Sequence, residues 1–358
     1  MKKQNKKVGN DLGQRGDLKP NRKKVWNIIL ICIAALLSVL VALVSVLILV
    51  GKNNLLNRGD FDLLFGEKTS EIEIVDDGTV VYKDQKYKYN ENVVSVLFIG
   101  IDKYKFYEER SGSGQADALF LANIDTKTGR TTIIPIPRDC MAEIDVFSED
   151  GKYLGIRRSQ ICLSYGYGDG KHSSCKNTAK AVSRMFCGVP INAYVAIDMD
   201  AIEVISEKVD GVDVVLTEDT VLARVEYKAG EQVNLRGYAA LDFVVLREDD
   251  LEASLKRMGR QKQFIDQFAA KVVQRTKKDI TTPITIFNSI KPYMVTNLDV
   301  ADISFLTSCF LTEAGNTEIE YKSIAGEATK PGEYIEYVYD FDSVYNIIID
   351  VFYTPVNS

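Results

Sequence analysis

Four successive segments form the centre of this chain: Val93-Val-Ser-Val-Leu-Phe-Ile-Gly-Ile-Asp102, Gly114-Gln-Ala-Asp117, Ala118-Leu-Phe-Leu-Ala-Asn-Ile124 and Thr131-Thr-Ile-Ile-Pro-Ile-Pro-Arg-Asp139. They contain three apolar runs of strand length, and each run stops at a cluster of polar residues. Two clusters hold the carboxylates of Asp102 and Asp117, and the third holds Arg138 beside Asp139. Because ligand sites in open α/β sheets lie where strands end, these clusters predict the floor of an active site.

Strand and helix patterns alternate on either side of this centre, which is typical of a layered α/β domain. The predicted strands cover residues 94–100, 118–124, 131–136, 193–197, 212–216 and 319–324. The predicted helices cover residues 175–186, 199–209, 254–277, 284–294, 303–311 and 343–352. Residues 79–89 predict a hairpin that turns near Lys83.

The N-terminus differs from the rest of the chain in charge and hydropathy. Residues 1–24 carry a net charge of +7, so the remainder carries −13 within the total of −6. Residues 25–50 are uncharged and apolar, and a helix of that length spans about 39 Å, more than the ~30 Å of hydrocarbon in a bilayer. We therefore predict an uncleaved membrane anchor with a cytoplasmic basic tail. A cleaved signal peptide, whose apolar core is typically ~7–15 residues, is the alternative.

These observations predict four parts: a cytoplasmic tail (1–24), a transmembrane helix (25–50), an extracytoplasmic stalk with a short hairpin (51–90) and a catalytic domain (91–355). The acidic main body argues against nucleic acid as a partner. His172 is the only histidine, which disfavours Ser-His and Cys-His hydrolases. The six cysteines form no C-x-x-C motif, which argues against a zinc or redox site, and their spacing assigns no disulfides.

The helix predicted at residues 254–277 carries polar side chains on its inward face. Steps of three and four residues extend the apolar stripe around Phe264 backwards to Arg257, Arg260 and Gln261. Burying arginine without an anionic partner is costly. These arginines therefore either pair with the carboxylates at the strand ends or bind an anionic ligand.

Five polar side chains from three segments form a candidate diphosphate site: Arg138, Arg247, Arg257, Arg260 and Gln261. Guanidinium groups bind phosphate oxygens bidentately. Asp102 and Asp117 offer the hard oxygen ligands that Mg²⁺ takes beside substrate phosphates. A structural network of ion pairs is the alternative interpretation of the same residues.

Eight motifs occur in order: Leu97-Phe-Ile-Gly-Ile-Asp102, Gly114-Gln-Ala-Asp117, Ile136-Pro-Arg-Asp139, Tyr165-Gly-Tyr-Gly168, Val209-Asp-Gly-Val-Asp-Val214, Leu235-Arg-Gly-Tyr-Ala-Ala-Leu241, Leu246-Arg247 and Arg257-Met-Gly-Arg-Gln261. From about Val93 to Lys277, this series resembles the LytR-CpsA-Psr family of cell-wall glycopolymer transferases. The resemblance implies a central mixed β-sheet flanked by helices, a three-layer α/β/α domain, with an apolar pocket for a polyprenyl chain.

The resemblance also implies an activity, which is Mg²⁺-dependent transfer of an anionic glycopolymer from undecaprenyl diphosphate to a muramic hydroxyl of peptidoglycan. The polymer would be teichoic acid, capsule or another secondary wall polymer, and the new bond a phosphodiester. Asp102 and Asp117 would hold the metal, and Asp117 would also accept the acceptor's proton. The diphosphate would be bound by Arg138, Arg247, Arg257, Arg260, Gln261 and Gln115, of which Arg138 and Arg257 would act in catalysis.

Two positions depart from the family's usual pattern. The family commonly has Arg-Ser-Asp where this chain has Gln115-Ala-Asp117, and Arg-x-Arg where it has Val245-Leu-Arg247. Gln115 can donate hydrogen bonds but carries no charge. The side chain of Val245 has neither a hydrogen-bond donor nor a charge. The departures favour a second hypothesis from another class, a non-catalytic protein that binds polyprenyl phosphate or glycopolymer in envelope assembly or signalling.

Overall fold

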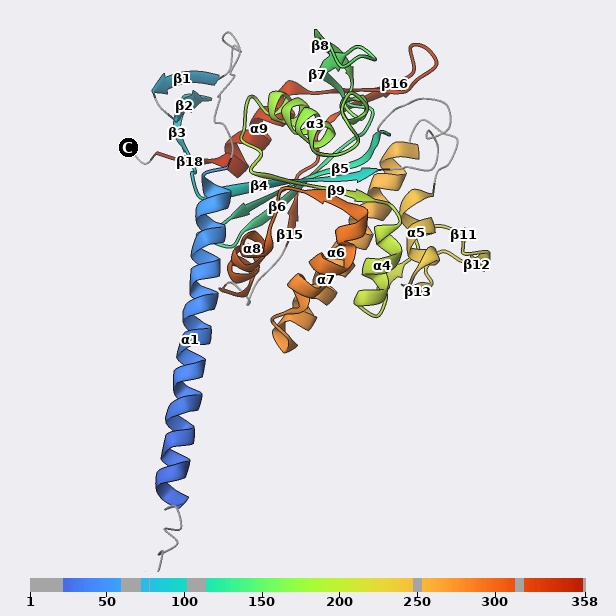
Figure 1. Cartoon of the computed structure of the whole chain (residues 1–358). Coiled ribbons are helices and arrows are strands. Elements are labelled where there is room, and N and C mark those ends of the chain that lie inside the picture. Colours follow the sequence, from blue (N-terminus) through green and yellow to red (C-terminus); the bar gives the residue numbers. More distant parts are fainter. Residues whose placement is uncertain are drawn as a thin grey trace, which may run out of the picture. The chain divides into compact units, whose positions relative to one another are not determined.

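The computed structural model describes residues 22–58, 72–76, 78–101, 114–246, 253–312 and 319–356. The chain divides into two compact units, Met1–Val46 and Leu47–Ser358. The second unit holds a central sheet, helices on both faces of that sheet and several small ribbons of short strands (Figure 1).

The central sheet is mixed, as expected. In the described part of the chain it has six strands, in the order β14 (Met294–Thr296), β9 (Ala193–Asp198), β4 (Val93–Ile101), β5 (Ala116–Asp125), β6 (Thr131–Ile136) and β15 (Ile319–Tyr321). Strand β4 is parallel to β9 and antiparallel to β5, and β15 is parallel to β6. The predicted antiparallel pairing of β5 with β6 is confirmed. Strand β4 lies in the interior of the sheet, which explains its almost continuous apolar sequence.

The two faces of β4 pack against different helices. Leu97 and Ile99 belong to a core that includes side chains of α3 (His172–Met185) and α9 (Phe341–Phe352). Val96 projects to the opposite face, since side chains alternate along a strand. It belongs to a second core with side chains of α7 (Thr282–Ile290) and α8 (Val300–Thr312). Helices therefore cover both faces of the sheet, which confirms the predicted α/β class.

Among the described residues, the other helical elements are α2 (Leu163–Gly166), α4 (Ala201–Lys208), α5 (Tyr238–Val245), α6 (Ala253–Lys278) and the 3-10 helix η1 (Lys291–Tyr293). One small sheet contains β1 (Ile72–Asp76), β2 (Thr79–Tyr82), β3 (Gln85–Tyr89) and β18 (Tyr353–Pro355). Paired ribbons are formed by β7 (Met141–Phe147) with β8 (Tyr153–Gln160), β10 (Val212–Val215) with β13 (Gln232–Leu235), β11 (Thr220–Leu222) with β12 (Val225–Tyr227), and β16 (Gly326–Thr329) with β17 (Glu336–Tyr339). The predicted hairpin at residues 79–89 is confirmed as β2–β3.

One predicted helix was too long. The pattern at residues 284–294 predicts a single helix, but α7 ends at Ile290 and η1 follows. Pro292 lies in η1, and proline has no amide hydrogen to continue an α-helix. Met294 then begins β14, which pairs with β9 at the edge of the central sheet.

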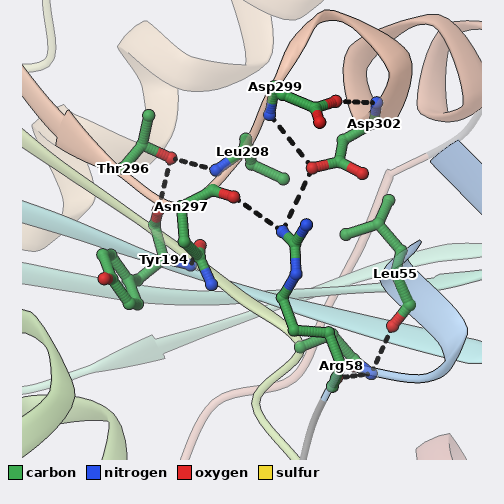
Figure 2. Close-up of polar contacts among 9 residues, drawn as sticks. Leu55, Arg58, Tyr194, Thr296, Asn297, Leu298, Asp299 and Asp302 are labelled. Carbon is green, nitrogen blue, oxygen red and sulfur yellow. Dashed lines mark hydrogen bonds and ion pairs between the residues drawn. The ribbon is translucent and has the colours of Figure 1, made fainter.

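The last turns of α1 (Arg22–Leu56), from Leu47 onward, belong to the second unit and pack against other elements of that unit. Leu55 is fully buried, and Gly51 lies so close to α8 that a Cβ there would be 2.1 Å from the carbonyl oxygen of Ala301. Just after the helix, Arg58 donates to the carbonyl of Asn297 at 2.7 Å and to the carboxylate of Asp302 at 3.1 Å (Figure 2). Packing and an ion pair together hold this end of α1.

Within the part of the chain that the structure describes, no helix combines the length and the apolar character needed to cross a membrane. The predicted anchor at residues 25–50 falls within α1, and the side chains of residues 22–37 lie outside the described part.

Candidate functional site

A small pocket lies where the ends of β5 and β6 meet α6. Its polar lining is Asp117, Arg138, Arg257 and Gln261, and its apolar lining includes Phe120. The cavity has a volume of about 10 Å³, which is room for about one water molecule. Four residues predicted for one site are therefore together, in an arrangement too tight to admit a diphosphate without movement.

A β-bulge places Asp117 at this pocket. Gly100 of β4 pairs with Ala118 of β5, whereas the next residue, Ile101, pairs with Ala116. Asp117 is thus the extra residue of the bulge. A bulge interrupts the regular alternation of a strand and re-aims a side chain, so Asp117 can turn toward the end of the sheet.

Arg138 follows β6 in a turn that is closed by a 3.0 Å hydrogen bond from the Cys140 amide to the Pro137 carbonyl. Its Nη1 forms an ion pair with the carboxylate of Asp117. Its Nη2 donates to Oε1 of Gln115 at 2.7 Å. The side chain of Arg138 is only 14% exposed, and its charge is compensated by Asp117 in this structure.

Helix α6 turns Arg257 and Gln261 inward, as the helical spacing predicts. These two residues are 5% and 7% exposed. Nη2 of Arg257 donates to the main-chain carbonyl of Asp117 at 3.2 Å, and Nε2 of Gln261 donates to the carbonyl of Val244 at 3.2 Å. The inward face of α6 therefore brings a second guanidinium to the bulge that carries Asp117.

One predicted residue, Arg260, does not join this group, and two others cannot be placed in it or outside it. Arg260 is buried, but it pairs with Glu218 at 3.0 Å and donates to the carbonyl of Leu246 at 2.5 Å. Asp102 and Arg247 lie outside the described residues. Nor do the residues that the structure describes contain a group of three or more His, Cys, Asp or Glu side chains arranged for a metal ion.

Two neighbours of the Arg138 turn were missed by the sequence reasoning. Sγ of Cys162 lies 3.5 Å from Nη2 of Arg138, and burial raises the pKa of this thiol. Nε2 of Gln160 donates to the carboxylate of Asp139 at 3.2 Å. Both residues come from the end of β8 and the segment after it. No local pattern marks them, because their partners lie more than 20 residues away in the sequence.

This arrangement suits an anionic ligand. Two nearly buried guanidinium groups and an amide face one pocket, where screening by water is weak and charge-assisted hydrogen bonds to phosphate are strong. The Asp117 carboxylate beside them offers an oxygen ligand for a hard cation or an acceptor for a proton. The apolar lining next to these groups is buried in this arrangement, since Leu119, Phe120 and Ile136 are 1%, 6% and 2% exposed.

A family model described as the LytR_cpsA_psr family matches residues 66–348. TagU of Bacillus licheniformis, a polyisoprenyl-teichoic acid–peptidoglycan teichoic acid transferase, is 27% identical over 263 residues, which are 73% of this chain and 78% of TagU. TagV of Bacillus subtilis carries the same description of activity and is 26% identical over 211 residues, which are 54% of this chain and 50% of TagV. The match with TagV thus spans about half of that relative.

Solved structures share the fold. The crystal structure of B. subtilis TagV aligns with a TM-score of 0.57 and 21% identity, covering 73% of this chain and 96% of TagV. TagT bound to LI-WTA aligns with a TM-score of 0.56 and 20% identity, covering 73% of this chain and 89% of TagT. At these identities the likeness establishes the fold alone.

Proposed function

Because this chain belongs to the LytR-CpsA-Psr family, we propose that it transfers an anionic glycopolymer from a polyprenyl-diphosphate carrier to a muramic hydroxyl of peptidoglycan. Its relatives TagU and TagV are named for the transfer of polyisoprenyl-linked teichoic acid to peptidoglycan. The observation that carries the proposal is the meeting of Asp117, Arg138 and Arg257 in one pocket.

The chemistry requires a diphosphate to be bound and its charge stabilised. The acceptor oxygen attacks the phosphorus that bears the glycopolymer, the bridging P–O bond breaks, and polyprenyl phosphate leaves. The products are a phosphodiester to peptidoglycan and the lipid monophosphate, which takes the negative charge of the broken bridge. Arg138 and Arg257 bind the phosphate oxygens as charge builds up on them. Asp117 accepts the proton of the attacking hydroxyl through the carboxylate oxygen that would not bind a metal ion.

Substrate entry requires Arg138 to change partners. Its Nη1 is paired with Asp117 and its Nη2 with Gln115 in the present arrangement. A diphosphate replaces Asp117 as the anionic partner of the guanidinium, which keeps the buried cation compensated throughout. The exchange also frees the Asp117 carboxylate for its role toward the acceptor.

An exposed aromatic side chain supports binding of the lipid. Phe98 lies in the sheet interior on β4, yet it is 39% exposed. It is paired with Phe120 of β5, which lines the pocket. Directly opposed residues of antiparallel strands project from the same face. Phe120 itself is only 6% exposed, so Phe98 is the exposed apolar side chain beside the pocket where we propose that the polyprenyl chain lies.

Mg²⁺ and membrane attachment complete the proposal. Asp117 is an oxygen ligand of the kind that Mg²⁺ prefers, and with Asp102 it would hold the ion, which would neutralise part of the phosphate charge when bound.

Eight apolar side chains of α1 between Val39 and Val50 are exposed, which supports an anchor at residues 25–50. The basic tail would be cytoplasmic and the catalytic domain extracytoplasmic.

The second candidate function is a non-catalytic polyprenyl-phosphate or glycopolymer receptor. Two observations favour it: Arg138 is already paired with Asp117, and Val245 replaces an arginine common in the family. A protein of this kind would bind the lipid carrier and release it unchanged.

A transfer assay separates the two functions. The full chain in detergent is incubated with a lipid-diphosphate-linked oligosaccharide, a peptidoglycan oligomer and MgCl₂, and the phosphodiester product is measured by mass spectrometry. We expect transfer by the wild type and a loss of at least ~100-fold in Arg138→Ala, because a donor to the transition-state charge is removed. Omitting MgCl₂ tests the metal separately.

The matched control is Arg130→Ala, which also removes an arginine from ion pairs, with Glu320 and Asp350, but at an exposed position away from the pocket. It should keep full transfer. No transfer by the wild type, or undiminished transfer by Arg138→Ala, would contradict the proposed enzyme. Retained binding of the lipid carrier without turnover would establish the receptor instead.

A further inference from the structure

We infer that Gln160 is a positioning residue for Arg138 and acts on it through Asp139. The inference rests on the proposed function, in which Arg138 binds the diphosphate. Gln160 is the last residue of β8 and is not among the residues that line the pocket. Its influence on the site therefore passes through a second side chain.

Asp139 is the link between Gln160 and the guanidinium. It follows Arg138 directly, is 7% exposed, and its Oδ1 lies 3.4 Å from Nε of Arg138. The two Nη atoms of Arg138 point to Asp117 and Gln115. Nε of Arg138 has no hydrogen-bond partner among the described residues, so Asp139 acts on the guanidinium through its charge, as an ion pair on the Nε side that favours the direction in which the Nη atoms point.

The position of Asp139 is in turn determined from two sides. Nε2 of Gln160 donates to its Oδ1 at 3.2 Å, and the amide of Tyr337 donates to its main-chain carbonyl at 2.8 Å. The same Nε2 atom also donates to the carbonyl of Ile335 at 2.7 Å. Gln160 therefore ties the Arg138 turn to the segment that enters β17.

The amide of glutamine suits this position because its NH₂ group has two donors. One hydrogen serves the carboxylate of Asp139 and the other the carbonyl of Ile335, and both acceptors are satisfied without adding charge. A glutamate here would present acceptors to acceptors and a second negative charge beside Asp139. A methionine would keep the length of the side chain but supply no donor.

The test measures binding of inorganic pyrophosphate to the full chain in MgCl₂ by titration calorimetry. We expect Gln160→Met to weaken binding about tenfold, as the loss of a hydrogen bond to a charged group implies. Gln160→Glu should weaken it further. Gln263→Ala is the matched control, since Nε2 of Gln263 also donates to a main-chain carbonyl, that of Val215, at 2.7 Å. It should bind like the wild type.

A double-mutant cycle distinguishes positioning from a merely structural role. If Gln160 acts through Arg138, Gln160→Met should have no further effect on binding in an Arg138→Ala background. An equal loss in both backgrounds, or wild-type binding by Gln160→Met and Gln160→Glu, would overturn the inference. If Gln160→Met fails to fold by circular dichroism, Asp139→Asn removes the same link and should show the same coupling. Absence of pyrophosphate binding in the wild type would instead refute the proposed function.

Discussion

Arg58, Arg130 and Arg138 each pair with a carboxylate, but their side chains are 29%, 47% and 14% exposed. Exposed ion pairs contribute little, because water screens them and competes for both partners. Near the interior, a charge interacts more strongly with its partner and costs more when the partner is removed. The contribution of each arginine to stability therefore depends more on how buried its ion pair is than on the number of its contacts.

This contrast predicts different stabilities for two matched variants. Arg58→Ala leaves Asp302, which is 0% exposed, without its cation, and burial already raises the pKa of that carboxyl. We expect a loss of about 3 kcal/mol in the free energy of unfolding. Arg130→Ala should lose less than about 1 kcal/mol. Denaturant unfolding of both variants measures the difference, and equal losses would be incompatible with the role given to the Arg58–Asp302 pair.

The sequence predicted the direction of those side chains whose orientation depends only on the helix that carries them. The inward direction of Arg257 and Gln261 follows from the helical repeat, and both residues are buried. Partner choice could not be predicted in the same way. Arg257 contacts Asp117 across 140 residues of sequence, and Gln160 contacts Asp139 only because β8 folds back along β7. Such contacts depend on tertiary structure, which no spacing rule contains.

At the scale of elements, two helical glycines have opposite surroundings. Gly51 in α1 has the backbone of α8 where its Cβ would lie, at 2.1 Å from the oxygen of Ala301. Gly259 in α6 has no atom within 4 Å of the same position. The first glycine allows two helices to approach, whereas the second only adds the conformational freedom of glycine to a helix interior.

Alanine substitutions should therefore have opposite signs. Gly51→Ala forces α1 and α8 apart and should lower the free energy of unfolding by about 1–3 kcal/mol. Gly259→Ala should raise it by up to about 1 kcal/mol, because alanine favours the helix. Unfolding of the two variants under one set of conditions gives both values. A stabilising Gly51→Ala would show that the close packing of α1 on α8 is absent in solution.

Long elements with a clear repeat were predictable, and short ones were not. Strands β4, β5 and β6 and helix α6 are long enough for the pattern of their apolar residues to be recognised in the sequence. The pairs β7–β8 and β16–β17 were not predicted. In β8, five of the eight residues are exposed and three are half-buried, with no regular alternation. The strand therefore forms through pairing with β7 and not through an amphipathic pattern.

For the whole molecule, the central claim is that distant segments build one diphosphate site. The bulge in β5, the turn after β6 and the inward face of α6 meet at a pocket that contains Asp117, Arg138 and Arg257. The order of motifs along the sequence indicated the family, and the family model confirms it. A network of ion pairs among these residues was the alternative interpretation, and the pair of Arg138 with Asp117 belongs to it. The choice of Asp117 as the partner could not be predicted, since it depends on how the bulge turns a single carboxylate.

The most direct measurement is a crystal structure of the protein bound to a polyprenyl diphosphate. The account predicts that Nη1 of Arg138 leaves Asp117 and lies about 3 Å from a phosphate oxygen, that Arg257 also contacts the diphosphate, and that the hydrocarbon chain covers Phe98. A diphosphate bound elsewhere, with the ion pair between Arg138 and Asp117 intact, would contradict it.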